Sequence, residues 1–210
     1  MFPSTTTEIP VTPVISQYAA TTIGIQCGPE AIKKFMTTLQ ESSNPALNGW
    51  MLEIVFFASL RNGGVTTVDD AAGNTLDKWS KASIVVSDGV PTLSTDHVVW
   101  IKPVKWNRGG YDAIMVCKRT QHVRMVQVTS AHTHTFRIDL FYMWLRNLSR
   151  SAESFEVKTL EIVFLVERKV LTDFKITKVD GEGKLVPFGW SHGEEKELVT
   201  RVGIKGLFEP

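Results

Sequence analysis

The chain has 210 residues and a mass of 23.5 kDa, with 43% hydrophobic and 21% charged residues. This composition is typical of one folded domain, or one domain with a short appendage, and excludes a chain that is disordered throughout. No apolar run reaches the roughly 18 residues that a membrane span requires, and the first residues show no signal-peptide pattern. Two cysteines, Cys27 and Cys117, are too few for a disulfide framework, so we expect free thiols without a disulfide partner.

The charge is distributed unevenly along the chain. The net charge is +1, but residues 101–150 carry nine Lys and Arg against two Asp, whereas residues 1–100 carry five Lys and Arg against nine Asp and Glu. This distribution indicates one positive face, which favours a polyanionic partner. The alternative is that these are ordinary solvated charges at the edges of helices and strands.

The N-terminal part divides into two segments. Residues 1–43 show little periodicity, and we expect a leader or linker with one short helix over 30–41. A second helix is predicted from residue 44 to 61, where the domain proper, 44–210, begins. This helix is apolar almost all round, which is typical of a buried helix. Its carboxylate, Glu53, would be costly to bury unless it is paired or bound to metal; the alternative is that Glu53 lies at a solvated edge.

The rest of the chain reads as short strands and one more helix. A helix is predicted over 133–148, and a nearly continuous apolar strand, buried on both faces, over 160–166. Other strands are predicted over 65–68, 76–79, 83–86, 97–102, 111–117, 123–129, 174–179 and 198–204, the first two as a hairpin. This order favours an α/β fold with a mixed central sheet flanked by helices.

Three oxygen donors are expected to meet. Asp112 begins a predicted strand, and Gln127 and Thr129 share one face of the next. Adjacent antiparallel strands would bring Asp112 beside Gln127. A metal site would then combine Asp112, Glu53 (directly or through a water) and a carbonyl oxygen, either of the Gln127 side chain or of the Val128 backbone. Such a site suits Mg²⁺, with Mn²⁺ as an alternative. Such an ion polarises a phosphodiester and lowers the pKa of an attacking water.

The basic segment supplies the expected contacts to a phosphate backbone. These are predicted for Lys102, Lys105, Arg108, Lys118 and Arg124. The expected partner is DNA, with RNA left open.

Three stretches carry a resemblance to a known family: residues 44–53, 106–113 and 126–136, the last containing Gln127-Val-Thr129 and His132-Thr-His134. In this order they resemble the C-terminal region of Crinkler effectors and the related tail of trypanosome retrotransposon hot spot proteins, over roughly residues 44–206. The resemblance implies a restriction-endonuclease-like fold of the PD-(D/E)XK superfamily and a Mg²⁺-dependent nuclease. It matches Asp112 to the catalytic strand Asp and Glu53 to a Glu that an earlier helix contributes.

The sequence departs from the Glu-x-Lys pattern of that superfamily. Gln127 stands in place of the Glu and Thr129 in place of the Lys. Since Thr129 carries no charge, another cation would have to replace the lysine; the choices are Arg137, His132, His134 and Lys118. Without a replacement, the domain would bind nucleic acid or a host protein without cutting.

The resemblance also implies a cellular role. Crinkler effectors are delivered into host cells and commonly act in the nucleus, so the chain would be a secreted effector, with a host nuclear protein as an alternative partner.

Overall fold

The computed structural model describes residues 17–38, 45–69, 75–93, 97–104, 110–151 and 155–204. Within them, the helices are α1 (Gln17–Cys27), α2 (Pro29–Thr38), α3 (Pro45–Asn62), α4 (Ile138–Ser149), α5 (Arg168–Leu171) and α6 (Glu195–Leu198). The strands are β1 (Val65–Val68), β2 (Thr75–Trp79), β3 (Ile84–Val86), β4 (Val99–Lys102), β5 (Ala113–Cys117), β6 (His122–Thr129), β7 (Thr133–Arg137), β8 (Thr159–Glu167), β9 (Lys175–Asp180) and β10 (Thr200–Ile204). A 3-10 turn covers Val186–Phe188.

Eight of these strands form one mixed sheet in the order β2-β1-β10-β8-β6-β5-β4-β3. The strands β4, β5 and β6 are antiparallel neighbours, and β8 returns parallel to β6 after α4. The predicted α/β class with a mixed sheet is therefore confirmed. Because of these directions, the carboxyl ends of β4, β6 and β8 lie at the same end of the sheet as the amino end of β5.

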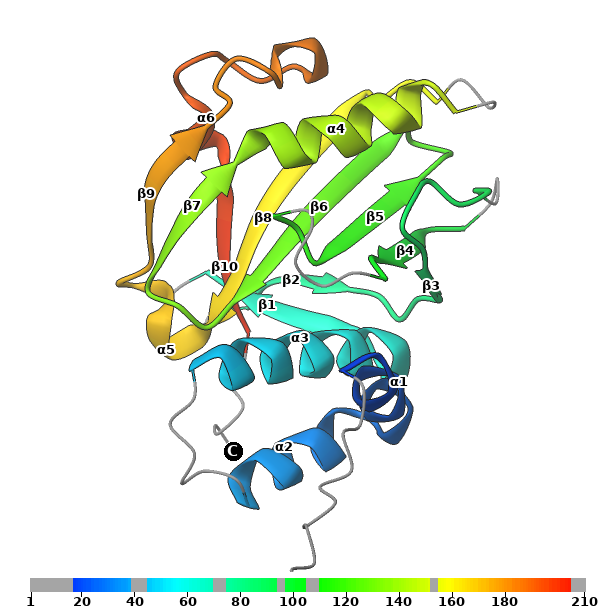
Figure 1. The fold of residues 1–210 in the computed structure, drawn as a ribbon, viewed down its shortest axis with the longest axis vertical. Coiled ribbons are helices and arrows are strands. Elements are labelled where there is room, and N and C mark those ends of the chain that lie inside the picture. Colours follow the sequence, from blue (N-terminus) through cyan, green and yellow to red (C-terminus); the bar gives the residue numbers. More distant parts are fainter. Residues whose placement is uncertain are drawn as a thin grey trace, which may run out of the picture.

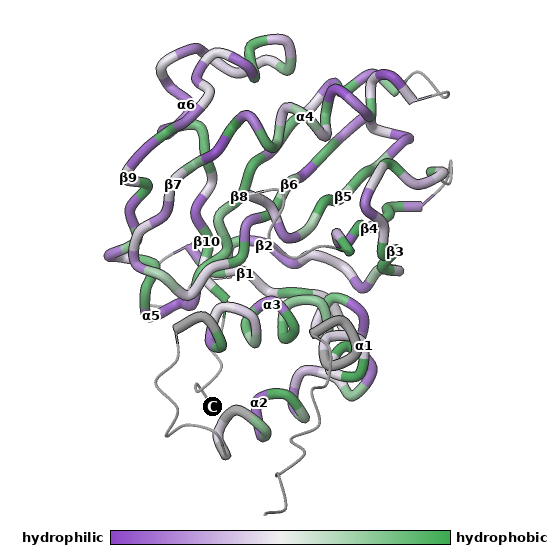
Figure 2. The backbone as a smooth tube through the Cα atoms, in the orientation of Figure 1, coloured by the Kyte–Doolittle hydropathy of each residue, from purple (hydrophilic) through white to green (hydrophobic). Residues whose placement is uncertain are grey.

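The sheet separates two hydrophobic cores. The α3 side buries Leu52 and Phe56 against alternate residues of the central strands, such as Val126. The α4 side buries Phe141 and Leu145 against the intervening residues. A fully buried Leu or Phe contributes about 1.5–3 kcal/mol relative to an exposed one, so both faces contribute to stability. Figure 1 shows α3 and α4 on opposite sides of the sheet, and Figure 2 shows the hydrophobic colouring of the central strands.

Strand β8 lies between β6 and β10, and its residues from Ile162 to Glu167 are all buried. This confirms the strand predicted to be covered on both faces.

The N-terminal segment differs from its prediction. Residues expected to be an extended leader form α1, which packs on α3 through a hydrogen bond from Trp50 Nε1 to Thr21 Oγ1 at 3.0 Å. The two helices approach closely at Gly24, where an added Cβ would lie 2.6 Å from Ile54 Cγ2. Residues 1–16 and 39–43 of the predicted leader lie outside the described residues.

The predicted helix over 133–148 is only partly correct. Its first five residues form β7, which pairs in parallel with β9 as a separate two-stranded sheet, and the helix begins at Ile138. The Thr-His-Thr sequence at the start of β7 suits an extended backbone because β-branched residues favour strands.

The sheet curls so that β2 reaches strands far from it in the sheet order. The rings of Trp79 on β2 and Trp100 on β4 are 5.6 Å apart. Arg124 on β6 lies with its guanidinium carbon 4.7 Å from the Trp79 ring centroid, and its Nη2 atom is 3.6 Å from Asp77 Oδ2. Arg124 thus connects the hairpin β1–β2 to the centre of the sheet.

The same arginine also binds Glu161 on β8, with 2.5 Å between Arg124 Nε and Glu161 Oε2, while His122 Nε2 lies 3.2 Å from that oxygen. Together His122 and Arg124 lower the pKa of Glu161 to about 2.

Two further features bear on the sequence expectations. No helix of the described residues has the length and apolar character to cross a membrane. Both cysteines are free thiols, Cys27 exposed and Cys117 half-buried.

Candidate functional site

The site lies at the end of the sheet where the carboxyl ends of β4 and β6 meet the amino end of β5. Lys102 is the last residue of β4, Asp112 directly precedes β5, and Gln127 is two residues from the end of β6. Glu53 reaches this end from the middle of α3, which packs on β6. We call the two acids at this end, together with the two polar residues bonded to them, the acidic cluster: Glu53, Lys102, Asp112 and Gln127.

The first pair in the cluster is a buried ion pair. Lys102 Nζ lies 2.6 Å from Glu53 Oε1, and their side chains are only 9% and 8% exposed. The ammonium also lies 5.2 Å from the ring centroid of Phe57, on the next turn of α3. Glu53 is thus buried and paired, as the apolar helix required. Breaking such a pair is expensive, because it leaves the remaining charge buried without a partner.

The second pair joins adjacent strands. The amide Nε2 of Gln127 donates to Asp112 Oδ2 at 2.6 Å, and the backbone N–H of Val128 donates to the same oxygen at 2.7 Å. The backbone N–H of Asp112 donates to the Val126 carbonyl at 2.8 Å. Asp112 and Gln127 are therefore neighbours, as the predicted strand pairing required. The amide nitrogen serves Asp112, so the amide oxygen is the atom of Gln127 that can bind a cation.

The two pairs interact electrostatically. Burial raises the pKa of Asp112 most, and the charge of Glu53 raises it further, so that it reaches about 8. Three smaller effects lower the pKa: the hydrogen bond from the Val128 backbone, the charge of Lys102 and the hydrogen bond from Gln127. The carboxylates of Glu53 and Asp112 are therefore close enough to interact electrostatically, as are Asp112 and the Lys102 ammonium. When both acids are ionised, the cluster has a net negative charge, which favours a further cation.

This donor set fits a hard divalent cation. Mg²⁺ is commonly held by one or two carboxylates, with other oxygen donors and waters completing its octahedron. Glu53, Asp112 and the Gln127 amide oxygen are donors of this kind. Within the part of the chain that the structure describes, no group of three or more His, Cys, Asp or Glu side chains could hold a metal. A fully protein-coordinated zinc-type site is therefore not what these residues offer.

The residues expected to replace the missing lysine lie in other surroundings. Thr129 is buried, and its hydroxyl accepts the Ala131 N–H at 3.2 Å. His134 packs its ring on Phe164 at 5.4 Å, with Nδ1 2.8 Å from the Thr135 carbonyl oxygen.

His132 and Arg137 are exposed. Among the described residues, none of Thr129, His132, His134 and Arg137 is hydrogen-bonded to Glu53 or Asp112. The cation next to the acids is instead Lys102, which the sequence had suggested as a phosphate contact.

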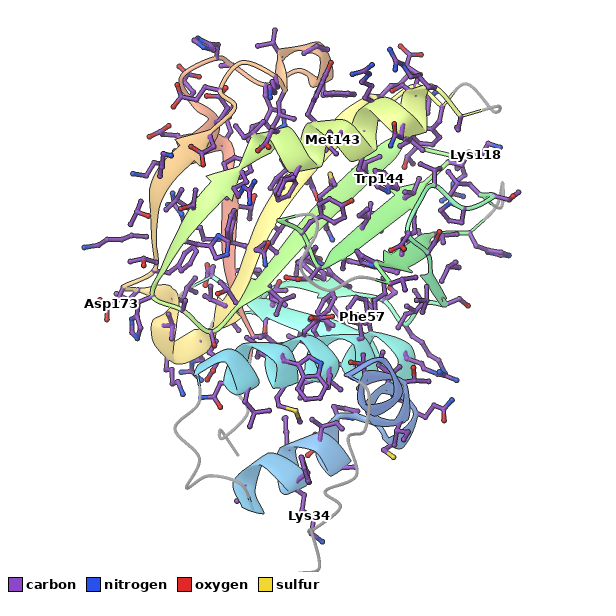
Figure 3. The ribbon with its side chains drawn as sticks, viewed as in Figure 1. Lys34, Phe57, Lys118, Met143, Trp144 and Asp173 are labelled. Atoms are coloured by element: carbon purple, nitrogen blue, oxygen red, sulfur yellow. The ribbon has the colours of Figure 1, made fainter. Side chains whose placement is uncertain are left out.

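The predicted basic face also differs from expectation. Lys102 is buried in the cluster, and Arg124 is engaged with Glu161 and Asp77. Lys118 lies at the turn after β5, the end of that strand opposite Asp112 (Figure 3). Lys105 and Arg108 lie outside the described residues. These side chains therefore do not form one positive surface over the described part of the chain.

The position of Lys102 could have been suspected from its place in the sequence. It ends the apolar run Val99-Trp-Ile-Lys102 and is followed by Pro103, so it sits at the edge of a buried strand. Period-two alternation puts Lys102 on the same face as Trp100, which belongs to the α3-side core. The helix residue opposite it, however, is set by tertiary packing, which local patterns do not give.

Comparisons of the chain with protein-family models, with curated proteins and with solved structures find no match.

Proposed function

We propose that this chain is a Mg²⁺-dependent nuclease of restriction-endonuclease-like fold that hydrolyses DNA phosphodiesters. The observation that carries the proposal is the convergence of Glu53, Lys102 and Asp112 at one end of the sheet. An earlier helix bears one acid, the start of a strand bears the other, and the next strand bears Gln127 and Thr129. This is the arrangement that the sequence resemblance implies.

The acids and the amide have separate roles in this proposal. Glu53 and Asp112 hold the metal, and the Gln127 oxygen is a third ligand, with Mn²⁺ as the alternative ion. The bound ion supplies polarisation of the phosphodiester and a lowered pKa for the attacking water. Hydrogen bonds from Gln127 and Val128 fix the orientation of the Asp112 carboxylate before any ligand arrives.

Lys102 provides the positive charge that Thr129 lacks. Its ammonium is already 2.6 Å from Glu53, so it lies beside a proposed ligand atom. From there it stabilises the negative charge that develops on the phosphate oxygens as water attacks phosphorus and the ester oxygen leaves with a proton. In this reading, the strand β4 carries the lysine that the family pattern places on the strand equivalent to β6.

The test is DNA cleavage with Mg²⁺, with Mn²⁺ and with a chelator. Asp112→Asn, which keeps the side-chain shape, and Lys102→Met are each expected to lower the rate at least about 100-fold. Asp173→Asn, an exposed acid on another part of the surface, is the matched control and should cut like the unaltered protein. Melting curves verify that each variant is folded. Equal cutting by Asp112→Asn and the unaltered protein, or no cutting with either metal, would contradict the proposal.

A second candidate is a catalytically inactive domain of the same fold that binds nucleic acid or a host protein. The observation that favours it is the pairing of Glu53 with Lys102, which neutralises both buried charges without any ion. This candidate predicts salt-sensitive DNA binding without turnover, measured by fluorescence anisotropy of a labelled duplex. Action as an effector in a host nucleus is likewise a proposal, supported by the sequence resemblance alone.

A further inference from the structure

Two adjoining cavities lie away from the acidic cluster. One, of about 580 Å³, is lined by residues of β2, β4, β5 and β6, and the other, of about 660 Å³, by the end of α3 and the start of β3. They share Lys81, Ala82 and Ser83. Cys117 lines the first cavity at the end of β5, five positions from Asp112, which corresponds to about 16 Å along a strand. The cavities are therefore separate from the proposed nuclease site.

The segment shared by the two cavities is fixed on both sides by backbone hydrogen bonds. The Ala82 N–H donates to the Leu60 carbonyl near the end of α3 at 3.1 Å, and the Ser83 carbonyl accepts the N–H of Trp100 on β4 at 3.3 Å. The segment is thus held in place before any ligand arrives, which lowers the entropic cost of binding there.

The side chains around both cavities are basic. Lys78, Lys81 and His97 line the first cavity, and Arg61 and Lys81 line the second. All four residues are exposed, and within the described part of the chain no carboxylate lies at ion-pair distance from any of them. We call Arg61, Lys78, Lys81 and His97 the basic surface.

The acid among the described residues that line the cavities does not cancel this charge. Asp77 accepts hydrogen bonds from the Lys78 backbone N–H at 2.7 Å and from Trp79 Nε1 at 2.9 Å, and its Oδ2 atom lies 3.6 Å from Arg124 Nη2. Its carboxylate is therefore already engaged by other groups. The charge that remains available at the basic surface is positive, which favours a polyanionic ligand.

The walls of the first cavity exclude a ligand that stacks its rings on the protein. Trp79 and Trp100 are only 6% and 2% exposed within the α3-side core, and the guanidinium of Arg124 lies on the Trp79 ring. Proteins that bind single-stranded nucleic acid stack its bases on aromatic side chains. A duplex needs no such platform, because its bases stack on one another and its phosphates lie on the outside. The cavity walls therefore favour a duplex over a single strand.

The chemistry of the surface also suits phosphate groups. Arg, Lys and Ser side chains are common donors to the phosphate oxygens of DNA, and Ser80 and Ser83 line the first cavity beside the lysines. A DNA duplex carries about one negative charge per 1.7 Å of its axis, whereas an extended acidic peptide advances about 3.3 Å per residue. The duplex therefore brings more charge to a surface of this size than a peptide does.

We propose that the basic surface binds the phosphate backbone of duplex DNA without regard to base sequence. The choice of DNA as the polyanion rests on the proposed function, whereas the position of the surface rests on Arg61, Lys78, Lys81 and His97. Because none of the acidic cluster lines the two cavities, the surface contributes affinity for the duplex and takes no part in the cleavage chemistry.

The experiment measures binding of a fluorescently labelled duplex by anisotropy, in a chelator and over a series of salt concentrations. Arg61→Gln with Lys81→Gln removes two phosphate contacts, so the slope of log affinity against log salt should become shallower by about 2. Affinity at about 0.1 M salt should fall at least about tenfold. Arg150→Gln with Lys175→Gln, a matched change at exposed residues of α4's end and β9, should leave both quantities unaltered. Melting curves verify that the variants are folded.

Three ligands separate duplex DNA from the alternatives. A second duplex of unrelated sequence should bind as tightly as the first, and a single strand of the same length should bind more weakly. A glutamate-rich peptide should displace the duplex only at a much higher concentration of charge. The proposal is overturned if the Arg61/Lys81 variant keeps the affinity and the slope, if the single strand binds more tightly, or if the peptide competes equally well per charge.

The chelator keeps this result independent of the proposed nuclease activity. Binding that depends on Arg61 and Lys81, in a protein that cuts no DNA with Mg²⁺ or Mn²⁺, would support the basic surface and contradict the nuclease. Cleavage that depends on Asp112, with binding that ignores Arg61 and Lys81, would support the nuclease and overturn the basic surface.

Discussion

Replacing Lys102 by methionine removes the ammonium that neutralises buried Glu53. Methionine is unbranched and apolar and fills much of the same space, so the change is mainly one of charge. Glu53, with 8% of its side chain exposed, would then be a buried carboxylate without a cation beside it. Removing one partner of a buried pair typically costs about 3–5 kcal/mol. That is a large part of the roughly 5–15 kcal/mol by which a domain is stable.

The assay is urea unfolding near neutral pH, followed by tryptophan fluorescence. Lys102→Met should lower the free energy of unfolding by about 3–5 kcal/mol, whereas Lys158→Met, at an exposed lysine, should change it by less than about 0.5 kcal/mol. The double variant Glu53→Gln with Lys102→Met removes both charges and should recover most of the loss.

Magnesium gives the same substitution a second readout. With the ammonium absent, a divalent cation can neutralise the two acids in competition with protons, so Mg²⁺ should restabilise Lys102→Met more than the unaltered protein. Mg²⁺ at about 100 times its dissociation constant would add about 2.7 kcal/mol. If Lys102→Met unfolds within about 1 kcal/mol of the unaltered protein without Mg²⁺, the reasoning about a buried charge pair is wrong.

Three further predictions concern pH and packing. Because the pKa of Asp112 is raised to about 8, its ionisation opposes folding, so stability should fall from about pH 4 to about pH 8. In melting experiments, Asp112→Asn should flatten that decline. An unchanged dependence of stability on pH would contradict this prediction. Glu161, with a pKa lowered to about 2, stabilises the fold above about pH 4.5 and loses this contribution as the pH falls toward 2. Glu161→Gln should therefore cost roughly 1 kcal/mol near neutral pH, allowing for solvent screening, and nothing near pH 2; an equal loss at both would refute it. Gly24→Ala places a methyl group 2.6 Å from Ile54 and should cost about 1–3 kcal/mol, or several degrees in melting temperature, whereas Gly63→Ala, with open space around it, should not.

Local patterns predicted most of the elements. The helix over 45–62, the hairpin β1–β2 and the strand β8 depend on apolar periodicity and on turn residues, which are properties of neighbouring positions. The predicted bounds of these elements differ from the observed ones by at most one residue at either end. The burial of β8 on both faces also followed from its continuous apolar run.

The two misassigned segments depend on contacts distant in sequence. The helix α1 has apolar residues on no single side, so its periodicity is weak, and it is buried through α3 at Gly24. The strand β7 is stabilised by pairing with β9, more than thirty residues later. A window of ten residues around either segment holds no information about its partner.

The sequence predicted the two acids of the candidate site, but it did not predict that Lys102 is the cation beside them. Glu53 stood out as a charge in an apolar helix, and the Asp112–Gln127 contact followed from strand pairing. The pairing of Lys102 with Glu53 joins residues 49 positions apart, and depends on how α3 lies across the end of β4. Residue spacing alone does not fix that angle.

The packing of α1 and α2 on α3 has a practical consequence for N-terminal truncation of the protein. Ile25 and Ile32 belong to the same core as Ile54, on the helix that carries Glu53. A version shortened to start at residue 44 would expose a continuous hydrophobic surface along α3, and such a surface promotes aggregation of the purified protein. Shortened versions should therefore retain everything from residue 17 onward.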